Sequence, residues 1–461
     1  MLSEVTKSKL TIDQQAAIVS IHIKYPDAPY EKIAAKMAEG FIEHGLKVAD
    51  VLRTLELISP FACDVGGGVW FYSNGYWNPD GQHEVNRRLT LFLGNKFRID
   101  HVNQLVAIIR GRIPQIVGPG PAKLINVKNG MLDWENEKVL DHDPKYFSTY
   151  QIPYNWNPGA SCPTVDTWFE GTFDSSITNL LWQVIGVTIY PMMGFQKAVV
   201  LIGGGFNGKS TYLRLIQRLI PRHFRSAIDI QSMSEDRFAS SQLFGKIANI
   251  CADVEKLTIK STAIFKSLTG QDEISAQFKG RNRFDFTSQA TLLFSGNEMP
   301  KSFDDSPGWF RRWLIIPVTN VIVGKADPTL EPRMHLEMEG VLVKAIRGLQ
   351  DAMAKGGFDE PDICREASER YEFASKSADW FIHDTLEISG NPVEKIGRSV
   401  LLKAYTNFCG DKKVEPASSH VLYESLKRIG EGRISECSTE VDGVQDRGFK
   451  GVIFRREVPA A

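Results

Sequence analysis

Residues 198–221 read AVVLIGGGFNGKSTYLRLIQRLIP, and the expected arrangement of the central domain follows from this stretch. Five apolar residues at 198–202 predict a buried strand, and an amphipathic helix follows the glycines until Pro221 ends it. Between the strand and the helix, the pattern GxxxxGKS at 203–210 has the spacing of a phosphate-binding loop. Strand and helix patterns alternate over 176–320, so we expect an α/β nucleotide-binding fold with a parallel sheet.

The residue types of this loop suit a phosphate group. Glycines let the backbone N–H groups turn inward, and the N-terminus of the following helix adds its positive dipole. Lys209 can bridge the β- and γ-phosphates, and the Ser210 hydroxyl can bind Mg²⁺. A glycine-rich turn that binds nothing is the alternative, which the flanking strand and helix disfavour. We therefore expect ATP and Mg²⁺ at a loop made of Gly203, Gly204, Gly205, Phe206, Asn207, Gly208, Lys209, Ser210 and Thr211.

Two carboxylates follow the next apolar segment, GKIANICADVEK at 245–256. Asp253 and Glu255 are two residues apart, so in an extended chain both side chains project from the same face. We assign Asp253 to the Mg²⁺ ion and Glu255 to the water that attacks the γ-phosphate, and the reverse assignment also fits. Solvated acids at the end of a strand are the alternative interpretation.

A polar residue also ends the apolar segment ATLLFSGNEMP at 290–300. The Asn297 amide can donate a hydrogen bond to a γ-phosphate oxygen and accept one from the attacking water. This position therefore suits a residue that senses hydrolysis.

Two adjacent arginines precede a further apolar strand in GWFRRWLIIP at 308–317. In ring ATPases an arginine of one subunit completes the site of its neighbour and stabilises transition-state charge. We favour Arg312 for this role over Arg311. Surface arginines paired with Asp304 and Asp305 are the alternative.

Composition excludes little. Lys and Arg (54) balance Asp and Glu (55), so any nucleic-acid contact must come from local basic clusters. The six cysteines form no C-x-x-C pair, which disfavours a zinc ribbon and favours reduced, packed thiols. The apolar stretch at 180–195 is interrupted before it reaches membrane-spanning length. We expect a soluble protein of the cytoplasm with no membrane contact.

The order of the motifs closely resembles that of superfamily 3 helicases of the phage and poxvirus primase–helicase kind. The similarity covers about residues 65–461, including segments before and after the motor. It is carried by GGGFNGKST at 203–211, ICADVEK at 250–256, FKSLTGQDEISAQFKGRNRFDF at 265–286, FSGNEMP at 294–300 and WFRRWLIIP at 309–317.

This resemblance implies a fold, an activity and an assembly. The core would be an AAA+-like ATPase preceded by an α/β domain and followed by a winged-helix-like module. The active form would be a homohexamer that hydrolyses ATP, translocates on single-stranded DNA and unwinds forked DNA, in the cytoplasm of a host cell. The implied domains are a helical lead-in at 1–60, the α/β domain at 61–175, the ATPase core at 176–335, a helical connector at 336–375 and the winged-helix-like module at 376–461.

The resemblance also assigns roles to individual residues. Lys209 and Ser210 would be the Walker A pair, Asp253 and Glu255 the Walker B acids, Asn297 the sensor and Arg312 the arginine finger. A basic hairpin would contact DNA at the pore, where cations follow phosphates and an aromatic packs on sugar or base; an ordinary exposed basic turn is the alternative. The hairpin residues are Phe278, Lys279, Arg281 and Arg283.

The sequence departs from the family pattern at three points. Gln277 replaces a common arginine, and Val254 separates the two acids that are adjacent in many relatives. The N-terminal part has neither a zinc-type cysteine cluster nor an evident polymerase-like acid pair. We therefore expect a separate primase and DNA polymerase as partners.

Two other functions remain open at this point. A DNA-binding initiator or loader would hydrolyse ATP without unwinding, and a P-loop kinase of a small metabolite would need no ring. The C-terminal module is equally open, because it would bind DNA or a partner, or only stabilise the hexamer. The cations in question there are Lys403, Lys427, Arg428 and Lys450.

Overall fold

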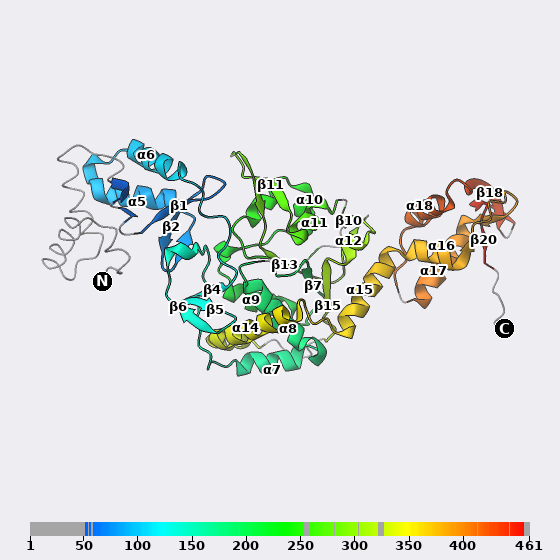
Figure 1. The fold of residues 1–461 in the computed structure, drawn as a ribbon. Coiled ribbons are helices and arrows are strands. Elements are labelled where there is room, and N and C mark those ends of the chain that lie inside the picture. Colours follow the sequence, from blue (N-terminus) through cyan, green and yellow to red (C-terminus); the bar gives the residue numbers. More distant parts are fainter. Residues whose placement is uncertain are drawn as a thin grey trace.

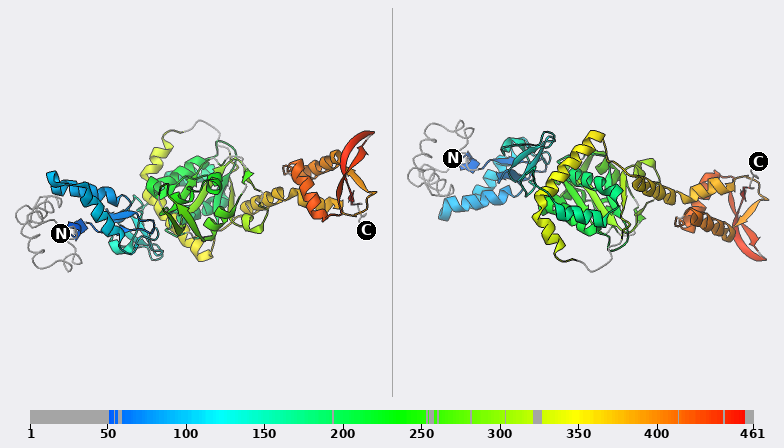
Figure 2. Two further views of the ribbon diagram at one scale, coloured as in Figure 1. Left: turned by 90° about the horizontal axis from the view of Figure 1, so that it is seen from above. Right: turned by 90° about the horizontal axis from the view of Figure 1, so that it is seen from below.

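The computed structural model shows three bodies in a row, with the central one built around a parallel sheet (Figures 1 and 2). The lead-in expected at 1–60 lies almost wholly outside the described residues, as do Asp253, Glu255 and Arg281. The described residues are 51–53, 55–56, 59–192, 194–252, 254, 258–259, 261–280, 282–302, 304–320, 327–412, 414–441 and 443–455.

The N-terminal module is mixed α/β. Its first antiparallel sheet packs on two helices, whereas the buried residues of its second sheet belong to the core of the central body. The first part contains β1 (Phe61–Cys63), β2 (Val69–Ser73), β3 (Tyr76–Asn78), α5 (Gly81–Leu93), η1 (Gly94–Lys96) and α6 (Ile99–Arg110); the second contains β4 (Leu124–Val127), β5 (Gly130–Asp133), β6 (Lys138–Leu140) and η2 (Pro144–Tyr146).

A five-stranded parallel sheet forms the centre of the molecule. Side chains alternate along its strands, so Val199 and Leu201 face one helical layer while Ala198 and Val200 face the other. Because both faces are covered, the central strands are mostly apolar, as parallel strands usually are, whereas the edge strand β8 is polar. In spatial order the strands are β15 (Trp313–Pro317), β7 (Ala198–Ile202), β13 (Thr291–Gly296), β9 (Ala248–Cys251) and β8 (Arg225–Ser226).

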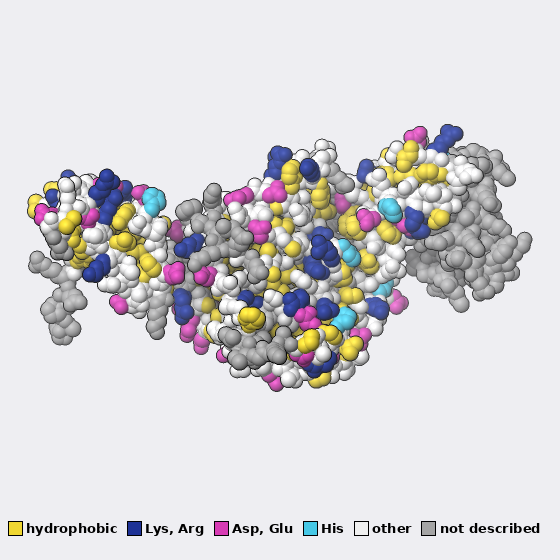
Figure 3. All heavy atoms as spheres, turned by 180° about the vertical axis from the view of Figure 1, so that it is seen from behind, with side chains coloured by type: hydrophobic (Ala, Val, Ile, Leu, Met, Phe, Trp, Pro, Cys, Tyr) yellow, Lys and Arg dark blue, Asp and Glu magenta, His cyan; other side chains and the backbone are white. Residues whose placement is uncertain are grey.

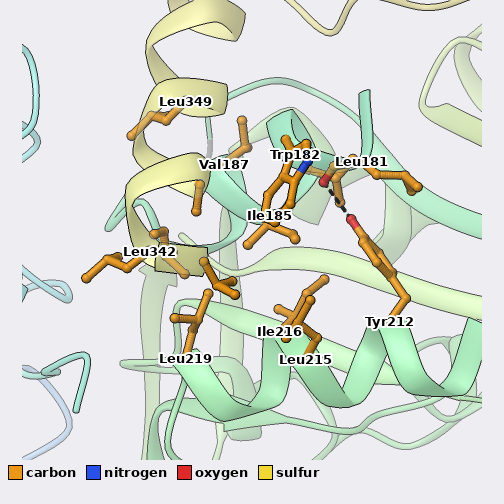
Figure 4. Close-up of a cluster of buried hydrophobic side chains, with 14 of the residues drawn as sticks. Leu181, Trp182, Ile185, Val187, Tyr212, Leu215, Ile216, Leu219, Leu342 and Leu349 are labelled. Atoms are coloured by element: carbon orange, nitrogen blue, oxygen red, sulfur yellow. Dashed lines mark hydrogen bonds between the residues drawn. The ribbon is translucent and has the colours of Figure 1, made fainter. Parts of the chain in front are cut away.

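Apolar side chains of three helices pack into one cluster on the first face of the sheet (Figure 4). The Tyr212 hydroxyl, buried among them, donates a hydrogen bond of 2.7 Å to the Leu181 carbonyl. Trp182 stacks on Phe169 with the ring centroids 4.6 Å apart. This layer contains α7 (Pro163–Thr172), α8 (Ser175–Ile189), α9 (Lys209–Leu219), α13 (Leu330–Leu336) and α14 (Met338–Lys355).

The opposite face is covered by short helices and an antiparallel hairpin. Phe265 stacks on Trp313, which lies at the start of β15, and Trp309 packs edge-on against the same ring. This layer contains α10 (Ile230–Glu235), η4 (Ser240–Leu243), α11 (Ala263–Gly270), α12 (Pro307–Phe310), the hairpin β11 (Glu273–Gln277) and β12 (Arg283–Thr287), and the short pair β10 (Thr258–Ile259) and β14 (Lys301–Ser302). The short helix η3 (Arg222–Phe224) instead adds Phe224 to the core of the first face.

The C-terminal module lies at the far end of α15 (Figures 1 and 2). It has its own core, in which Phe381, Tyr405 and Phe449 are fully buried. Helix α15 (Asp362–Ser375) packs against β15 and leads to this module. The module's own elements are α16 (Ser377–Thr385), β16 (Leu386–Glu387), β17 (Lys395–Gly397), α17 (Arg398–Asp411), α18 (Ser419–Gly430), β18 (Ser435–Val441), β19 (Val444–Lys450) and β20 (Ile453–Phe454).

The connector expected at 336–375 divides into two parts. Helix α14 lies inside the core of the central body against α8, and only α15 leads away from it. Five of the six cysteines are buried and none of the six is in a disulfide. Within the described part of the chain, none of the helices combines the length and the apolar character that crossing a membrane requires.

Two glycines allow α8 and α14 to approach closely, and this contact yields a stability prediction. A Cβ at Gly186 would lie 2.2 Å from the Ala345 carbonyl oxygen, and one at Gly348 would lie 2.4 Å from that of Trp182. We expect Gly186→Ala and Gly348→Ala each to lower the free energy of unfolding by about 1–3 kcal/mol through overpacking. Urea unfolding followed by circular dichroism measures this loss.

Gly171 provides the matched control, because it is also helical but a Cβ there would meet no heavy atom within 4 Å. At this position, Gly171→Ala should be neutral or stabilising by up to about 1 kcal/mol, since alanine is the better helix former. Equal effects at all three glycines would contradict the close approach of the two helices.

Candidate nucleotide site and basic hairpin

The glycine-rich loop joins the carboxyl end of β7 to the first turn of α9. Gly208 has φ +84°, and a Cβ there would lie 2.5 Å from Thr172 Cγ2 on α7. A Cβ at Gly203 would lie 2.1 Å from the Val318 carbonyl oxygen, just beyond β15. Both glycines are therefore required by the close approach of neighbouring elements, and Gly208 also by its left-handed backbone.

The middle of the loop faces open space. A Cβ at Gly204 or Gly205 would meet no heavy atom within 4 Å, and both residues are exposed. Phe206 has φ +56° and is 88% exposed. The loop therefore has room for a phosphate group on the side away from Val318 and Thr172.

The Lys209 ammonium is held beneath this loop. It donates hydrogen bonds to the carbonyl oxygens of Gly203 (2.6 Å) and Gly204 (2.7 Å) and to Asn207 Oδ1 (3.0 Å). Asn207 is buried, and its Nδ2 donates to the Val318 carbonyl oxygen at 3.0 Å. The geometry thus concentrates positive charge at the N-terminus of α9, where anions are favoured.

The hydroxyl side chains follow directly. Ser210 is exposed in the first turn of α9, while Thr211 Oγ1 accepts a hydrogen bond from Arg214. Among the described residues, no three His, Cys, Asp or Glu side chains gather as metal ligands would. This donor set still fits Mg²⁺, which usually takes one or two protein oxygens together with substrate phosphates and water.

The strand expected to end in two acids lies beside β13. The Val254 N–H donates to the Ser295 carbonyl oxygen at 2.7 Å, which continues the pairing of β9 with β13. The Gly203 N–H in turn donates to the Gly296 carbonyl oxygen at 3.2 Å, so the exposed Asn297 follows a residue bonded to the phosphate loop. The roles of Asp253 and Glu255 stay predictions, because both lie outside the described residues.

The arginine pair lies at the other end of the strands from the glycine-rich loop, where β7 and β15 begin. The Ala198 N–H, at the start of β7, donates to the Arg312 carbonyl oxygen at 2.7 Å. The Arg312 guanidinium donates to the carbonyl oxygens of Lys266 (3.2 Å) and Gly308 (2.7 Å). Burial, and secondly the charge of Arg311, lower the pKa of Arg312. Arg311 itself is exposed.

A purely structural role would pair these arginines with Asp304 and Asp305. The ion pairs that the described residues form do not include such a pair. The Asp304 carboxylate instead pairs with Lys266 and accepts a hydrogen bond from Thr262. Arg311 is thus exposed to solvent, whereas Arg312 is held to the turn by its two hydrogen bonds.

The basic hairpin extends from β11 and β12, whose register pairs Gln277 with Arg283. Lys279 and Arg283 are exposed. Phe278 is half-buried, stacks on Phe284 of the same hairpin with the centroids 5.2 Å apart, and packs against the core cluster of the second face. The sequence alone placed Phe278 with the DNA contacts; the structure brings Lys279 and Arg283 to solvent and turns this ring inward.

The cations expected to act in the C-terminal module include two with acidic partners. Lys427 pairs with Glu424 and Glu436, and Arg428 pairs with Asp379. Their charges are therefore largely neutralised within the module.

Sequence reasoning missed the residues that support the loop from α7 and from beyond β15. Thr172 precedes Gly208 by more than thirty positions, and Val318 follows it by more than a hundred. No local pattern signals either contact, because both arise only when distant segments pack.

This fold defines a class of protein. The chain is an α/β protein whose parallel sheet carries a glycine-rich loop between a strand and a helix. Two family models match parts of the chain. Residues 201–312, which run from the end of β7 to Arg312, match a "Family of unknown function (DUF5906)", and residues 100–174 match "D5 N terminal like". The second match relates the chain to phage-type replication proteins of the primase–helicase kind.

Solved structures of the NrS-1 C-terminal region in apo form are also similar. Two of them have 12% sequence identity and cover 87% of this chain and 98% of that chain, with TM-scores of 0.48 and 0.47.

The loop geometry separates glycines that serve the fold from glycines that leave room for a ligand. We expect Gly204→Ala to leave the free energy of unfolding within about 0.5 kcal/mol of the parent value, because its Cβ meets nothing. The same methyl group should weaken ATP binding at least about tenfold by occupying space next to the phosphates. Thermal unfolding without nucleotide and fluorescence titration with a labelled ATP analogue give the two values.

Gly208→Ala is the contrasting variant. It should cost about 1–2 kcal/mol for the left-handed backbone alone, before its contact with Thr172 is counted. Normal stability of Gly208→Ala, or normal ATP affinity of Gly204→Ala, would contradict this division.

Proposed function

We propose that this protein is an ATP-dependent, ring-forming DNA helicase of phage-type replication. One subunit binds ATP at the 203–211 loop, an arginine of the next subunit completes the site, and the β11–β12 hairpin moves single-stranded DNA. One observation carries this proposal. The phosphate loop lies at the carboxyl ends of the neighbouring strands β7 and β15, and the arginine pair lies at their amino ends.

This separation bears directly on assembly. Lys209 follows the carboxyl end of β7, whereas Arg312 is bonded to its first residue. Five strand residues span roughly 17 Å, which is longer than an extended arginine side chain. Neither arginine can therefore reach the phosphate loop of its own subunit, and a role in hydrolysis requires a neighbour.

The strand order supports an AAA+-like core. Numbered along the chain, the five strands lie in the order 5-1-4-3-2, with the phosphate loop after the first. Ligands of open parallel sheets bind at the carboxyl ends of the strands, where this loop lies. In the C-terminal module, two successive helices followed by the β18–β19 hairpin support a winged-helix-like fold.

The chain's own residues suggest how the site works. Lys209 would exchange loop carbonyls for phosphate oxygens, and the Ser210 hydroxyl together with Asp253 would hold Mg²⁺, which would neutralise phosphate charge. Asn297 would orient the attacking water, with Glu255 as its base. Lys279 and Arg283 would follow the phosphates of a strand without sequence preference. A separate primase and DNA polymerase would complete the replication machinery in the host cytoplasm.

Lys209→Ala tests the nucleotide half of the proposal. Loss of the ammonium should reduce ATP hydrolysis about 100-fold or more and abolish displacement of a forked DNA strand. Lys145→Ala, which removes an exposed lysine of the N-terminal module, should leave both activities unchanged. Parent protein that hydrolyses ATP without separating strands would instead favour an initiator or loader, and phosphate transfer to a metabolite by a monomer would favour a kinase.

The arginine pair tests the ring. We expect Arg311→Ala to bind ATP and fold normally but to lose about 10³-fold or more in turnover, because the exposed guanidinium acts on the neighbour. Arg312→Ala should in addition lower the melting temperature, since it removes hydrogen bonds to two carbonyls. Mixing Arg311→Ala with Lys209→Ala subunits should restore partial turnover, whereas a monomer would gain nothing from mixing.

A further inference from the structure

A cleft of about 880 Å³ lies between the N-terminal module and the central body. One wall comes from β2, the segment between β3 and α5 and the start of α5, and the other from η3, β8 and the segment before β9. Helix α9 has the phosphate loop at its N-terminus and this cleft just beyond its C-terminus. The cleft is therefore separate from the proposed nucleotide site.

The lining of the cleft is basic, although the chain as a whole has a net charge of −1. Lys and Arg side chains also gather over the middle of the central body on the face drawn in Figure 3. The cleft itself is lined by four Lys or Arg residues and only two Asp residues: Arg110, Arg222, Arg225 and Lys246 against Asp64 and Asp80.

The hydrogen bonds of these cations leave their charge uncompensated. Arg225 donates to the carbonyl oxygens of Gln217 and Ile220 at the end of α9, and Lys246 donates to that of His223. Arg110 donates to the Gly67 carbonyl oxygen. Neutral carbonyls accept a hydrogen bond but do not cancel a charge, so the cluster still favours an anion.

In the part of the chain that the structure describes, the acidic side chains of the cleft do not form ion pairs with these cations. The buried Asp64 carboxylate accepts hydrogen bonds from Trp70 Nε1 (2.6 Å) and the Gly68 N–H (2.7 Å). Within the described chain, the ion pairs formed include none of the four cations. Burial lowers the pKa of Lys246, and burial followed by the charge of Arg222 lowers that of Arg225.

Aromatic side chains complete the lining and connect the cleft to the hairpin. Trp70 and Phe244 line it together with Phe278, which belongs to the hairpin tip. Lys279, the next residue, therefore lies beside the rim of the cleft. Cations together with aromatic rings suit a flexible strand, whose phosphates and bases they can contact.

We propose that this cleft binds the phosphate backbone of single-stranded nucleic acid, as a second contact on the strand that the hairpin grips. This inference rests on the proposed function. The volume lies in the range of pockets for ligands of modest size, roughly 300–1,000 Å³, so a short stretch of one strand fits and a duplex does not. A free polyphosphate would share the same chemistry.

Strand binding to charge variants tests the inference. Arg222 is exposed, so Arg222→Glu should fold normally; Lys246→Gln removes a second charge from the same wall. Fluorescence anisotropy of a labelled oligothymidylate, with a non-hydrolysable ATP analogue present, measures affinity over a range of salt concentrations. Arg347→Glu, an exposed charge reversal on α14 away from the cleft, is the matched control, and Lys279→Ala reports on the hairpin.

We expect each cleft variant to weaken strand binding on the order of tenfold and Arg347→Glu to leave it unchanged. The slope of log affinity against log salt should fall by about 0.7 for each phosphate contact removed. Cleft variants that match the control while Lys279→Ala weakens binding would overturn the inference and leave the proposed function standing. Parent protein that binds tripolyphosphate through Arg222 but no oligothymidylate would overturn both.

Discussion

The packing of the phosphate loop between two distant backbone segments is the constraint on which the rest of the structure depends. Val318 approaches Gly203 from beyond β15, and Thr172 approaches Gly208 from α7. Both contacts exclude any side chain larger than hydrogen. The loop conformation is thereby fixed by the fold before a ligand arrives, which reduces the ordering cost of binding. Because β15 also begins beside Arg312, a single strand links the loop of one subunit to the arginine that would serve its neighbour.

Charge is distributed according to what the cations contact. In the C-terminal module, Lys427 and Arg428 pair with carboxylates, which reduces the attraction of these two cations for a polyanion. In the cleft beside η3, Arg225 and Lys246 donate hydrogen bonds to neutral backbone carbonyls. The chain as a whole has balanced charges, but the cleft has a local excess of basic residues, because most of the acidic residues lie outside it. The side of the central body that faces the N-terminal module is thus the better surface for a strand.

The sequence predicted the elements whose signals are local. The strand expected at 198–202 is β7, and the apolar segment at 290–300 contains β13. Contacts between distant segments gave no signal. The inclusion of α14 in the core, the inward turn of Phe278 and the cleft all depend on packing that periodicity does not encode.

Helix α9 connects the two anion-attracting regions of the central body. Its N-terminus begins at Lys209, and Arg225 binds the carbonyls at its C-terminal end. Arg225 complements the negative C-terminal end of the helix dipole, whereas the positive N-terminal end favours an anion. An anion in the cleft would compete with the carbonyls for Arg225 and so change the contacts at the C-terminal end of α9. The buried face of this helix, which includes Tyr212 and Ile216, is too tightly packed for one end to move independently of the other. A displacement at one end must therefore be felt at the other, which is the physical basis on which a bound strand could influence hydrolysis.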